Sequence, residues 1–320
     1  MAVPYLGRDL RFAIGEESTW GTEASRTMTI RGKSSTVMAR ATHEPLPHLV
    51  SAASVGAVQS ESFEAKERTS GTIEAVAGYA GNGLGLLLKH AMGTVADAGA
   101  GPYTHTFTMA STLPTGLSAC QQRGTANAEE FYGGKVSKLV LSVEAGKPMF
   151  VMADMVFKNA GARAAASPSL PALASFTPVL HNEAGNLAFN SVNYSPRNFK
   201  LTIDNGLDSD GVHELGTLYI AEPDRGDYVN VTIECDLVYR TDALYTAHLA
   251  KTAANVTLTF TSGSMSLAFT LHNAILEKCE DPISAAGYIT QSVRWRGYAD
   301  ASNSGLAIVL TNNTATGIGS

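Results

Sequence analysis

Hydrophobic and polar residues alternate along much of this chain, with the period of two that predicts half-buried β-strands. In one such segment, Phe63, Ala65, Ile73, Ala75, Ala77 and Tyr79 occupy alternate positions. In another, apolar positions between 136 and 143 lead into the turn Gly146-Lys147-Pro148, and alternation resumes over residues 149–157. The pattern predicts a mainly β fold in which this second segment is a long hairpin.

Two short segments have helical spacing instead. Residues 81–93 predict a helix that begins at Asn82, ends at Gly93 and has one apolar face, formed by Leu84, Leu87, Leu88 and Ala91. A second helix is expected from about Thr241 to Ala250. Each helix follows a predicted strand and precedes another, so both belong to the same order of elements.

That order is repeated along the chain. Thr72-Ile73-Glu74 with Tyr79 recurs as Thr232-Ile233-Glu234 with Tyr239, at one offset of 160 residues. Each match is followed by a helix and a strand, at 103–108 in the first copy and 256–261 in the second. A chain that holds two copies of one module can close a ring with half the usual number of subunits, so the repeat bears on assembly.

The repeat divides the chain into four parts. Residues 1–25 are predicted to be an N-terminal arm that docks on another surface, with Trp20 as the candidate anchor. Residues 26–160 form the first module, 161–190 an Ala/Ser/Pro-rich linker, and 191–320 the second module. The second module is expected to end in a hairpin from Tyr288 to Leu310.

Composition narrows the function. Charged residues are 16% of the chain, well below the usual quarter, and the formal net charge is −6. The low charge favours a surface covered by subunit contacts, with a Thr/Ser/Asn-rich solvated β surface as the alternative. There is no basic run for tight nucleic-acid binding and no apolar run long enough to span a membrane. The charged N-terminal residues do not resemble a signal peptide, so we expect a protein made in a cytoplasm.

The sequence contains no pattern typical of a catalytic or cofactor site. Cys120, Cys235 and Cys279 have no metal-type spacing and are expected to be buried small apolar residues, so neither metal nor cofactor is predicted. Glycines at 81, 83 and 85 before the first helix lack the lysine of a phosphate-binding loop. They are interpreted as a flexible helix entry.

Acidic residues occur at several positions on predicted strands. Three interpretations stay open: acid/base chemistry, solvated strand faces, or carboxylates that face a channel and repel a passing polyanion. The candidate lumen-facing residues under the third interpretation are Glu61, Glu64, Glu74, Glu234 and Asp236.

Four segments, taken in order, resemble the major tail tube proteins of long-tailed bacteriophages. They are the arm motif Ala13-Ile14-Gly15-Glu16-Glu17-Ser18-Thr19-Trp20-Gly21-Thr22, the helix region 83–93, the stretches 103–107 and 113–118, and Phe199-Lys200-Leu201-Thr202-Ile203-Asp204-Asn205-Gly206-Leu207. The resemblance covers most of the chain. It implies two tandem β-sandwich or barrel modules, each with one flanking α-helix, whose inner sheets close around a lumen in stacked rings.

The resemblance also implies a role and partners. The protein would be a structural, non-enzymatic component of the virion tail, assembled in the host cytoplasm, through which DNA passes without specific binding. Its partners would be copies of itself, a tape-measure protein, and tail terminator and tail-tip proteins, with no membrane. Two modules per chain favour three chains per ring. Alternatively, the two halves weave into one larger module and six chains form each ring.

Two other functions are alternatives for a β-rich chain of this kind. A two-domain β-sandwich that binds carbohydrate or a cell surface would need an exposed aromatic platform, for which the chain offers only Trp20 and Trp295 as tryptophans. A β-sandwich hydrolase would need carboxylates confined to one copy, whereas Glu74 and Glu234 occupy repeated positions. Repetition at equivalent places favours an architectural role.

Overall fold

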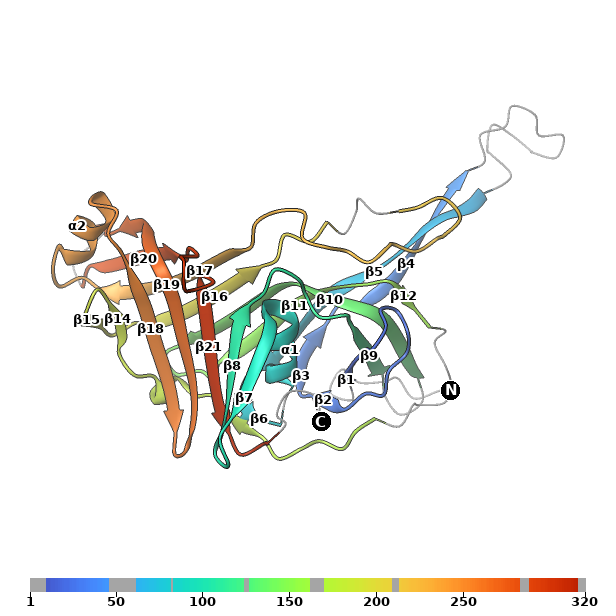
Figure 1. Cartoon of the computed structure of the whole chain (residues 1–320), viewed down its shortest axis with the longest axis horizontal. Coiled ribbons are helices and arrows are strands. Elements are labelled where there is room, and N and C mark those ends of the chain that lie inside the picture. The colour runs from blue at the N-terminus through green and yellow to red at the C-terminus, as the bar shows by residue number, and fades with distance from the viewer. Residues whose placement is uncertain are drawn as a thin grey trace.

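The structure is a computed structural model that describes residues 10–45, 62–81, 83–123, 127–161, 170–208, 213–282 and 288–315. Most of these residues are in β-strands, and two α-helices accompany them, which confirms the predicted mainly β fold (Figure 1). The helices are α1 (Leu84–Met92) and α2 (Ala243–Leu249), with a short 3-10 helix at His181–Glu183.

The strands fall into two series along the chain. The first comprises β1 (Leu10–Glu16), β2 (Met28–Ile30), β3 (Gly32–Ser35), β4 (Met38–Pro45), β5 (Ser62–Val76), β6 (Gly78–Ala80), β7 (Gly93–Ala98), β8 (Tyr103–Met109), β9 (Leu117–Arg123), β10 (Asn127–Glu144), β11 (Phe150–Phe157) and β12 (Asn159–Ala160). The second comprises β13 (Thr177–Pro178), β14 (Leu187–Phe189), β15 (Val192–Tyr194), β16 (Asn198–Asp204), β17 (Asn230–Val238), β18 (Ala253–Ser262), β19 (Met265–Glu280), β20 (Thr290–Arg296) and β21 (Leu306–Asn312).

One antiparallel sheet, here called the central sheet, crosses both halves of the chain. Its order is β3 and β4 on one side of β5, then β11, β10, β16, β17, β20 and β19. Core-facing residues lie opposite one another across it, in the order Ile73, Ala153, Leu139 and Ile203. Within the described residues, no series of strand pairings returns to its starting strand, so the sheet does not close and keeps free edges.

Two long strands carry the chain from the central sheet into outer layers. Strand β10 pairs with β9 over its first half and with β16 over its second, while β12 and β11 share its opposite edge. Strand β19 pairs with β18 on one edge and with β21 and then β20 on the other. The order β5–β11–β10–β9 in the first half therefore matches β17–β20–β19–β18 in the second. Strand β18 thus corresponds to β9, and the predicted match of residues 103–108 in β8 to 256–261 in β18 is wrong.

Alternation explains which side of each strand is buried. On β16, Phe199, Leu201 and Ile203 face the core, whereas Lys200 and Thr202 face outward. Phe199, Phe260 and Phe269 then cluster with ring centroids 5.3–6.3 Å apart, and Trp295, fully buried, packs against Phe189 at 5.6 Å. Aromatic side chains bury large areas, so this cluster is a main part of the core.

The two helices differ from each other and from the prediction. Helix α1 begins at Leu84 after Gly83, whose φ of 67° favours glycine, and it ends before Gly93. The predicted start, Asn82, lies outside the described residues. All of α1 except Lys89 is buried, rather than one face only, because β10 and the β7–β8 hairpin enclose it. In α2, by contrast, Leu244 alone is buried.

Two other elements differ from the prediction. The prediction of a final hairpin from Tyr288 to Leu310 is wrong. Strands β20 and β21 lie end to end along one edge of β19 and do not pair with each other. The long β19 offers room for both, which sequence proximity alone does not reveal. The arm contains a strand that was not predicted, since β1 pairs with β9 and β2.

The two halves are woven together as well as repeated. Strand β16 pairs with β10, and β21 pairs with β8. The buried side chain of Asn205, just beyond β16, donates from Nδ2 to the carbonyls of Ala91 (3.0 Å) and Val136 (2.9 Å) and accepts from Arg225. The boundaries at 26–160, 161–190 and 191–320 stay a prediction.

We predict that Asn205→Ala destabilises the whole chain. The change leaves two buried carbonyls and part of the Arg225 guanidinium without a partner, which costs about 2–4 kcal/mol in the free energy of unfolding. Urea titration followed by tryptophan fluorescence measures it. Asn303→Ala, in the exposed turn with Asp300, is the matched control and should change the value by less than about 0.5 kcal/mol. Equal effects of the two variants would contradict the role given to Asn205.

Candidate functional site: the open face of the central sheet

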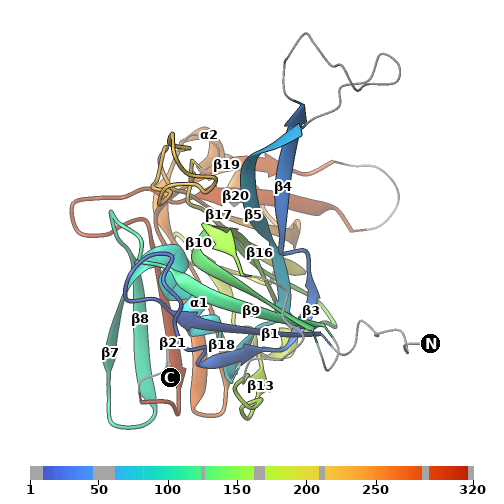
Figure 2. The same cartoon turned by 90° about the vertical axis from the view of Figure 1, so that its right-hand side faces the viewer.

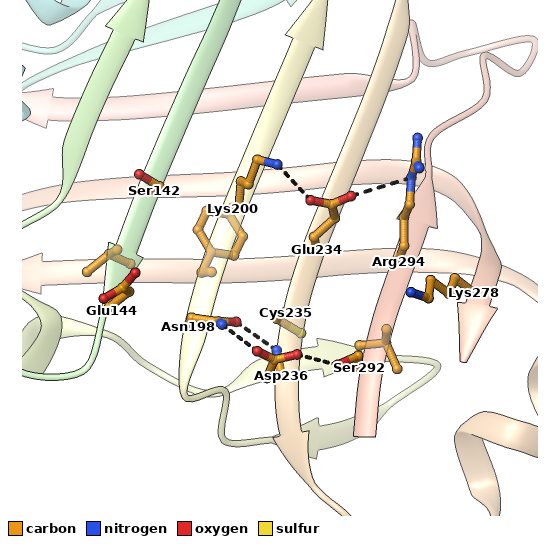
Figure 3. A pocket seen from close by; sticks show the side chains of 13 residues that line it. Ser142, Glu144, Asn198, Lys200, Glu234, Cys235, Asp236, Lys278, Ser292 and Arg294 are labelled. Carbon is orange, nitrogen blue, oxygen red and sulfur yellow. Dashed lines mark hydrogen bonds and ion pairs between the residues drawn. The ribbon is translucent and has the colours of Figure 1, made fainter. Parts of the chain in front are cut away.

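The outward face of the central sheet is lined with charged and polar side chains, and it is hollowed over β10, β16, β17 and β20 (Figure 3). The side chains that face outward alternate with those in the core, as on β20, where Ser292, Arg294 and Arg296 alternate with buried Gln291, Val293 and Trp295. This face is the candidate functional surface.

A ladder of opposite charges crosses four strands of this face. Lys200 Nζ lies 2.9 Å from Glu234, whose other carboxylate oxygen is 3.8 Å from Arg294 Nε. On β19, Glu277 lies 3.6 Å from both Arg294 and Arg296. All five side chains are about one-third to one-half exposed. Exposed pairs add little stability, so the ladder sets the charge of the face more than the stability of the fold.

Asp236 lies on the same face but is held by hydrogen bonds from neutral groups. Asn198 Nδ2 donates to one carboxylate oxygen at 2.6 Å, and the Ser292 hydroxyl donates to the other. The backbone amide of Asp236 in turn donates to Asn198 Oδ1 at 2.7 Å. The carboxylate is therefore fixed in place between β16 and β20 (Figure 3).

Glu74 is the first-half counterpart of Glu234. Lys33 Nζ lies 2.8 Å from its carboxylate, and the Ser34 hydroxyl donates to it at 3.2 Å. The glutamate of each repeated Thr-Ile-Glu motif thus pairs with a lysine from the strand beside it, β3 in the first half and β16 in the second. Ile73 and Ile233, between the two polar residues of each motif, are both in the core.

The five predicted lumen residues are only partly brought together. Glu74, Glu234 and Asp236 share the open face, whereas Glu64 lies towards the far end of β5, on the hairpin that β4 and β5 form (Figure 2). Glu61 lies outside the described residues. The cations opposite these carboxylates were not predicted, and they make the face mixed in charge rather than acidic. The position of Lys200 between apolar Phe199 and Leu201 indicates an outward-facing cation, and this was the sequence feature that could have predicted it.

The predicted arm anchor, Trp20, docks on its own chain. Its indole Nε1 donates to the Gly133 carbonyl at 3.0 Å, and Lys158 Nζ lies 4.8 Å from the ring. Nearby, buried Glu17 accepts hydrogen bonds from the amides of Gly21 (2.7 Å) and Gly133 (2.8 Å) and from the Ser118 hydroxyl. These bonds hold the arm against β10 at Gly133, where the pairing of β10 with β9 is irregular.

Glu16 joins the end of β1 to helix α1. Its carboxylate lies 2.5 Å from Lys89 Nζ and 3.4 Å from His90 Nε2. The hydrogen bond with His90, assisted by Lys89 and opposed by partial burial, lowers the pKa of Glu16 to about 2. Lys89 and His90 are both in the last turn of the helix, where the positive charge of Lys89 is favourable. Burial lowers the pKa of His90 below its usual value.

Other chemistry is sparse in the part of the chain that the structure describes. Cys120 and Cys235 are buried, as predicted, whereas Cys279 is only partly buried, so the prediction is wrong for that residue. Burial raises the pKa of the Cys120 thiol to about 11. No group of three or more His, Cys, Asp or Glu side chains in the described ranges is arranged to hold a metal ion. Among those same residues, no helix is both long and apolar enough to cross a membrane.

Comparison with known proteins agrees with the β architecture. A family model described as phage tail tube protein matches residues 7–297, which is nearly the whole chain. No curated protein matches the chain.

We predict that Glu16→Gln removes part of the acid sensitivity of the fold. A carboxylate whose pKa falls on folding stabilises the native state above its unfolded value, near 4.5, and this stabilisation is lost as the pH falls towards 2. The melting temperatures of the wild type and of Glu16→Gln should therefore differ most above pH 4.5 and converge between about pH 4.5 and 2. A difference that is constant from pH 7 to 2 would contradict the assignment.

Proposed function

Because this chain belongs to the phage tail tube protein family, we propose that it assembles with copies of itself into stacked rings that form the tube of a virion tail. The family identifies a structural tail tube protein. The ring, its symmetry and the passage of DNA through it are the finer parts of the proposal. The observation that carries them is the central sheet, which is long and continuous yet open at both ends.

Free sheet edges favour pairing with another chain, and closing a sheet into a ring removes them. The central sheet ends at β3 and β4 on one side and at β19 on the other. Pairing these two ends between neighbouring copies would leave no unpaired end in the ring. The apolar core face would lie outside the closed sheet, covered by α1, α2 and the outer strands, while the charged open face lines the lumen.

Three chains per ring is the arrangement that the repeat supports. The strands β3/β4–β5–β11–β10 and β16–β17–β20–β19 are two successive four-stranded units joined at the β10–β16 junction. A ring of three chains would then contain six such units with pseudo-sixfold symmetry. The weaving of β21 onto β8 adds contacts between the halves but leaves the two units of the central sheet distinct.

The charge of the open face suits a lumen through which DNA slides. Because Lys200, Arg294 and Lys33 offset Glu234 and Glu74, the face presents neither a strongly attractive nor a strongly repulsive field. In this proposal Glu74, Glu234 and Asp236 face the lumen. The far ends of β4 and β5, where Glu64 lies, extend beyond the rest of the central sheet and would contact the adjacent ring (Figures 1 and 2).

The remaining partners follow from the same proposal. A tape-measure protein would occupy the lumen during assembly, and terminator and tail-tip proteins would cover the two ends of the tube. Assembly would take place in the host cytoplasm. The alternative of a carbohydrate-binding or cell-surface-binding module has no support from the tryptophans, because Trp295 is fully buried and Trp20 is held against Gly133 and Lys158.

We predict that the purified chain, concentrated and left to stand, forms rings or tubes visible by negative-stain electron microscopy. Native mass spectrometry of single rings should give the mass of three chains. A species of six chains would contradict the symmetry but not the tube. If the protein stays monomeric at every salt concentration, even with preformed tail tips added as initiators, the proposed function is wrong.

We predict that the double substitution Glu74→Lys and Glu234→Lys makes the lumen bind DNA, which the lumen of the wild-type tube does not. Each change removes a carboxylate beside a lysine and adds a cation, so the open face becomes strongly basic. Fluorescent short duplex DNA should sediment with variant tubes at low salt, be released as salt rises, and not sediment with wild-type tubes. Glu23→Lys with Glu214→Lys, at two exposed glutamates outside the central sheet, adds the same positive charge and is the control. Equal DNA binding by all three proteins would contradict a lumenal position for Glu74 and Glu234.

A further inference from the structure

The second half of β19 has one unused edge. Strand β18 follows β19 only as far as the pair Ala253–Ile275, and no described strand continues along residues 276–280. On β10, the equivalent edge is fully used: β9 pairs with 127–134 and β16 with 138–144. By comparison with the internal junction between β10 and β16, the free edge of β19 lacks a partner strand in the position of β16.

The matching edge lies on β3. Strand β3 pairs with β5 at the place where β16 pairs with β17, since Ser35 lies opposite Ile73 as Leu201 lies opposite Ile233. The amide of Thr36 donates to the Thr72 carbonyl at 2.9 Å, towards β5. Peptide groups alternate in direction along a strand, so those of Ser35 point to the opposite edge. In the described part of the chain, no strand pairs with that edge.

The peptide groups of β19 point outward at corresponding positions. The carbonyl of Leu276 accepts a hydrogen bond from His248 Nδ1 at 2.7 Å, so that ring nitrogen carries the proton. His248 belongs to α2, on the side of β19 away from β20. In the isolated chain this imidazole takes the place that a neighbouring strand's amide would occupy, which blunts the free edge.

We propose that residues 276–280 of β19 receive β3 of a second copy of this chain, in the register of the internal β10–β16 junction. The inference rests on the proposed function and names the contact that closes the ring. Its partner is a second copy because β3 alone reproduces, in the first repeat, the place that β16 has in the second.

The register follows from the repeat. Leu139 and Leu276 hold equivalent places, opposite Ala153 and Trp295, which are themselves opposite Ile73 and Ile233. Leu139 lies opposite Ile203, two residues beyond Leu201. Leu276 of one copy therefore lies opposite Val37 of the next, two residues beyond Ser35. After the irregularity between Leu276 and Lys278, Lys278 lies opposite Thr36 and Cys279 opposite Ser35.

The internal β10–β16 junction also indicates which opposite residues of the proposed β19–β3 junction exchange backbone hydrogen bonds. The amide of Asn205 donates to the Ser137 carbonyl, so Leu139–Ile203 and Leu141–Leu201 are hydrogen-bonded pairs, and Val140–Thr202 between them is not. Lys278 and Thr36 correspond to Val140 and Thr202. Their Cα atoms would be about 4.5 Å apart, within the range that a disulfide needs.

Helix α2 extends the same docking surface. Tyr245 and Leu249, one turn apart, are 45% and 65% exposed, whereas helix α1 is almost entirely covered. The second repeat also lacks a counterpart of the β7–β8 hairpin between its helix and its next strand, which leaves α2 open. A neighbouring copy seated on β19 would cover these apolar side chains as it pairs.

The test is a disulfide across the junction. Thr36→Cys and Lys278→Cys are combined in a chain carrying Cys279→Ser, which removes the half-buried thiol next to the new one. After assembly and mild oxidation, a non-reducing gel should show covalent dimers and trimers and nothing larger. A mixture of chains carrying only one new cysteine each should stop at dimers. The matched control, Ser34→Cys with Lys278→Cys, shifts one thiol by two residues on the same face and should give little product.

The outcomes separate this inference from the proposed function. Tubes that form but give no more product than the control overturn the register while leaving the tube intact. Absence of any ring or tube in the unmodified chain overturns both. Hydrogen exchange on the unmodified chain keeps the test independent of the cysteine variants: the amides of Ser35 and Cys279 should gain protection on assembly, whereas those of β18, already paired with β19, should not change. Unchanged exchange at Ser35 and Cys279 would also overturn the inference.

Discussion

The backbone pairing between β10 and β16 is the contact on which the rest of this structure depends. It joins two repeated sets of strands into one antiparallel sheet, with Leu139, Leu141 and their partners Ile203 and Leu201 all on the core side. The two strands pair without a break from Lys138–Asp204 to Glu144–Asn198, and such pairing is how buried strands satisfy their peptide groups. In the described residues, the same pairing is absent at the two ends of the sheet. The fold pairs two strand edges within the chain, at the β10–β16 junction, and leaves the edges at the ends of the sheet unpaired. Such a fold is suited to pairing with copies of itself.

Charge on the open face follows from the same geometry. An antiparallel sheet places residues of neighbouring strands side by side, so the Lys200–Glu234 pair and its counterpart Lys33–Glu74 arise wherever the repeated strand order occurs. The pairs add little to stability in water. Their effect is to cancel charge along a surface that, in the proposed tube, borders a polyanion. Acidic residues alone would leave that surface with a stronger field, and the lysines and arginines of β16 and β20 prevent it.

Much of the fold was predictable from the sequence because its signals are local. Period-two alternation located β5, β10 and β11, and the repeated Thr-Ile-Glu motif located equivalent strands. Strand β1 was not predicted because Phe12, Ala13 and Ile14 are all buried, so apolar and polar residues do not alternate there. The predicted hairpin of β20 and β21 was wrong because both strands pair with the long β19 instead, and the alternation within each strand does not reveal its partner. The cations opposite Glu74 and Glu234 were missed for a related reason, since cross-strand neighbours are defined only once the register is known.

The measurement that tests the central claim most directly is a cryo-electron microscopy reconstruction of the assembled tube at a resolution that separates strands. The account predicts three chains per ring, a central sheet that continues from β19 of one chain into β3 of the next, and Glu234 and Asp236 on the lumen wall. Rings in which neighbouring copies meet through other surfaces, or in which the open face of the central sheet lies on the outside of the tube, would contradict it.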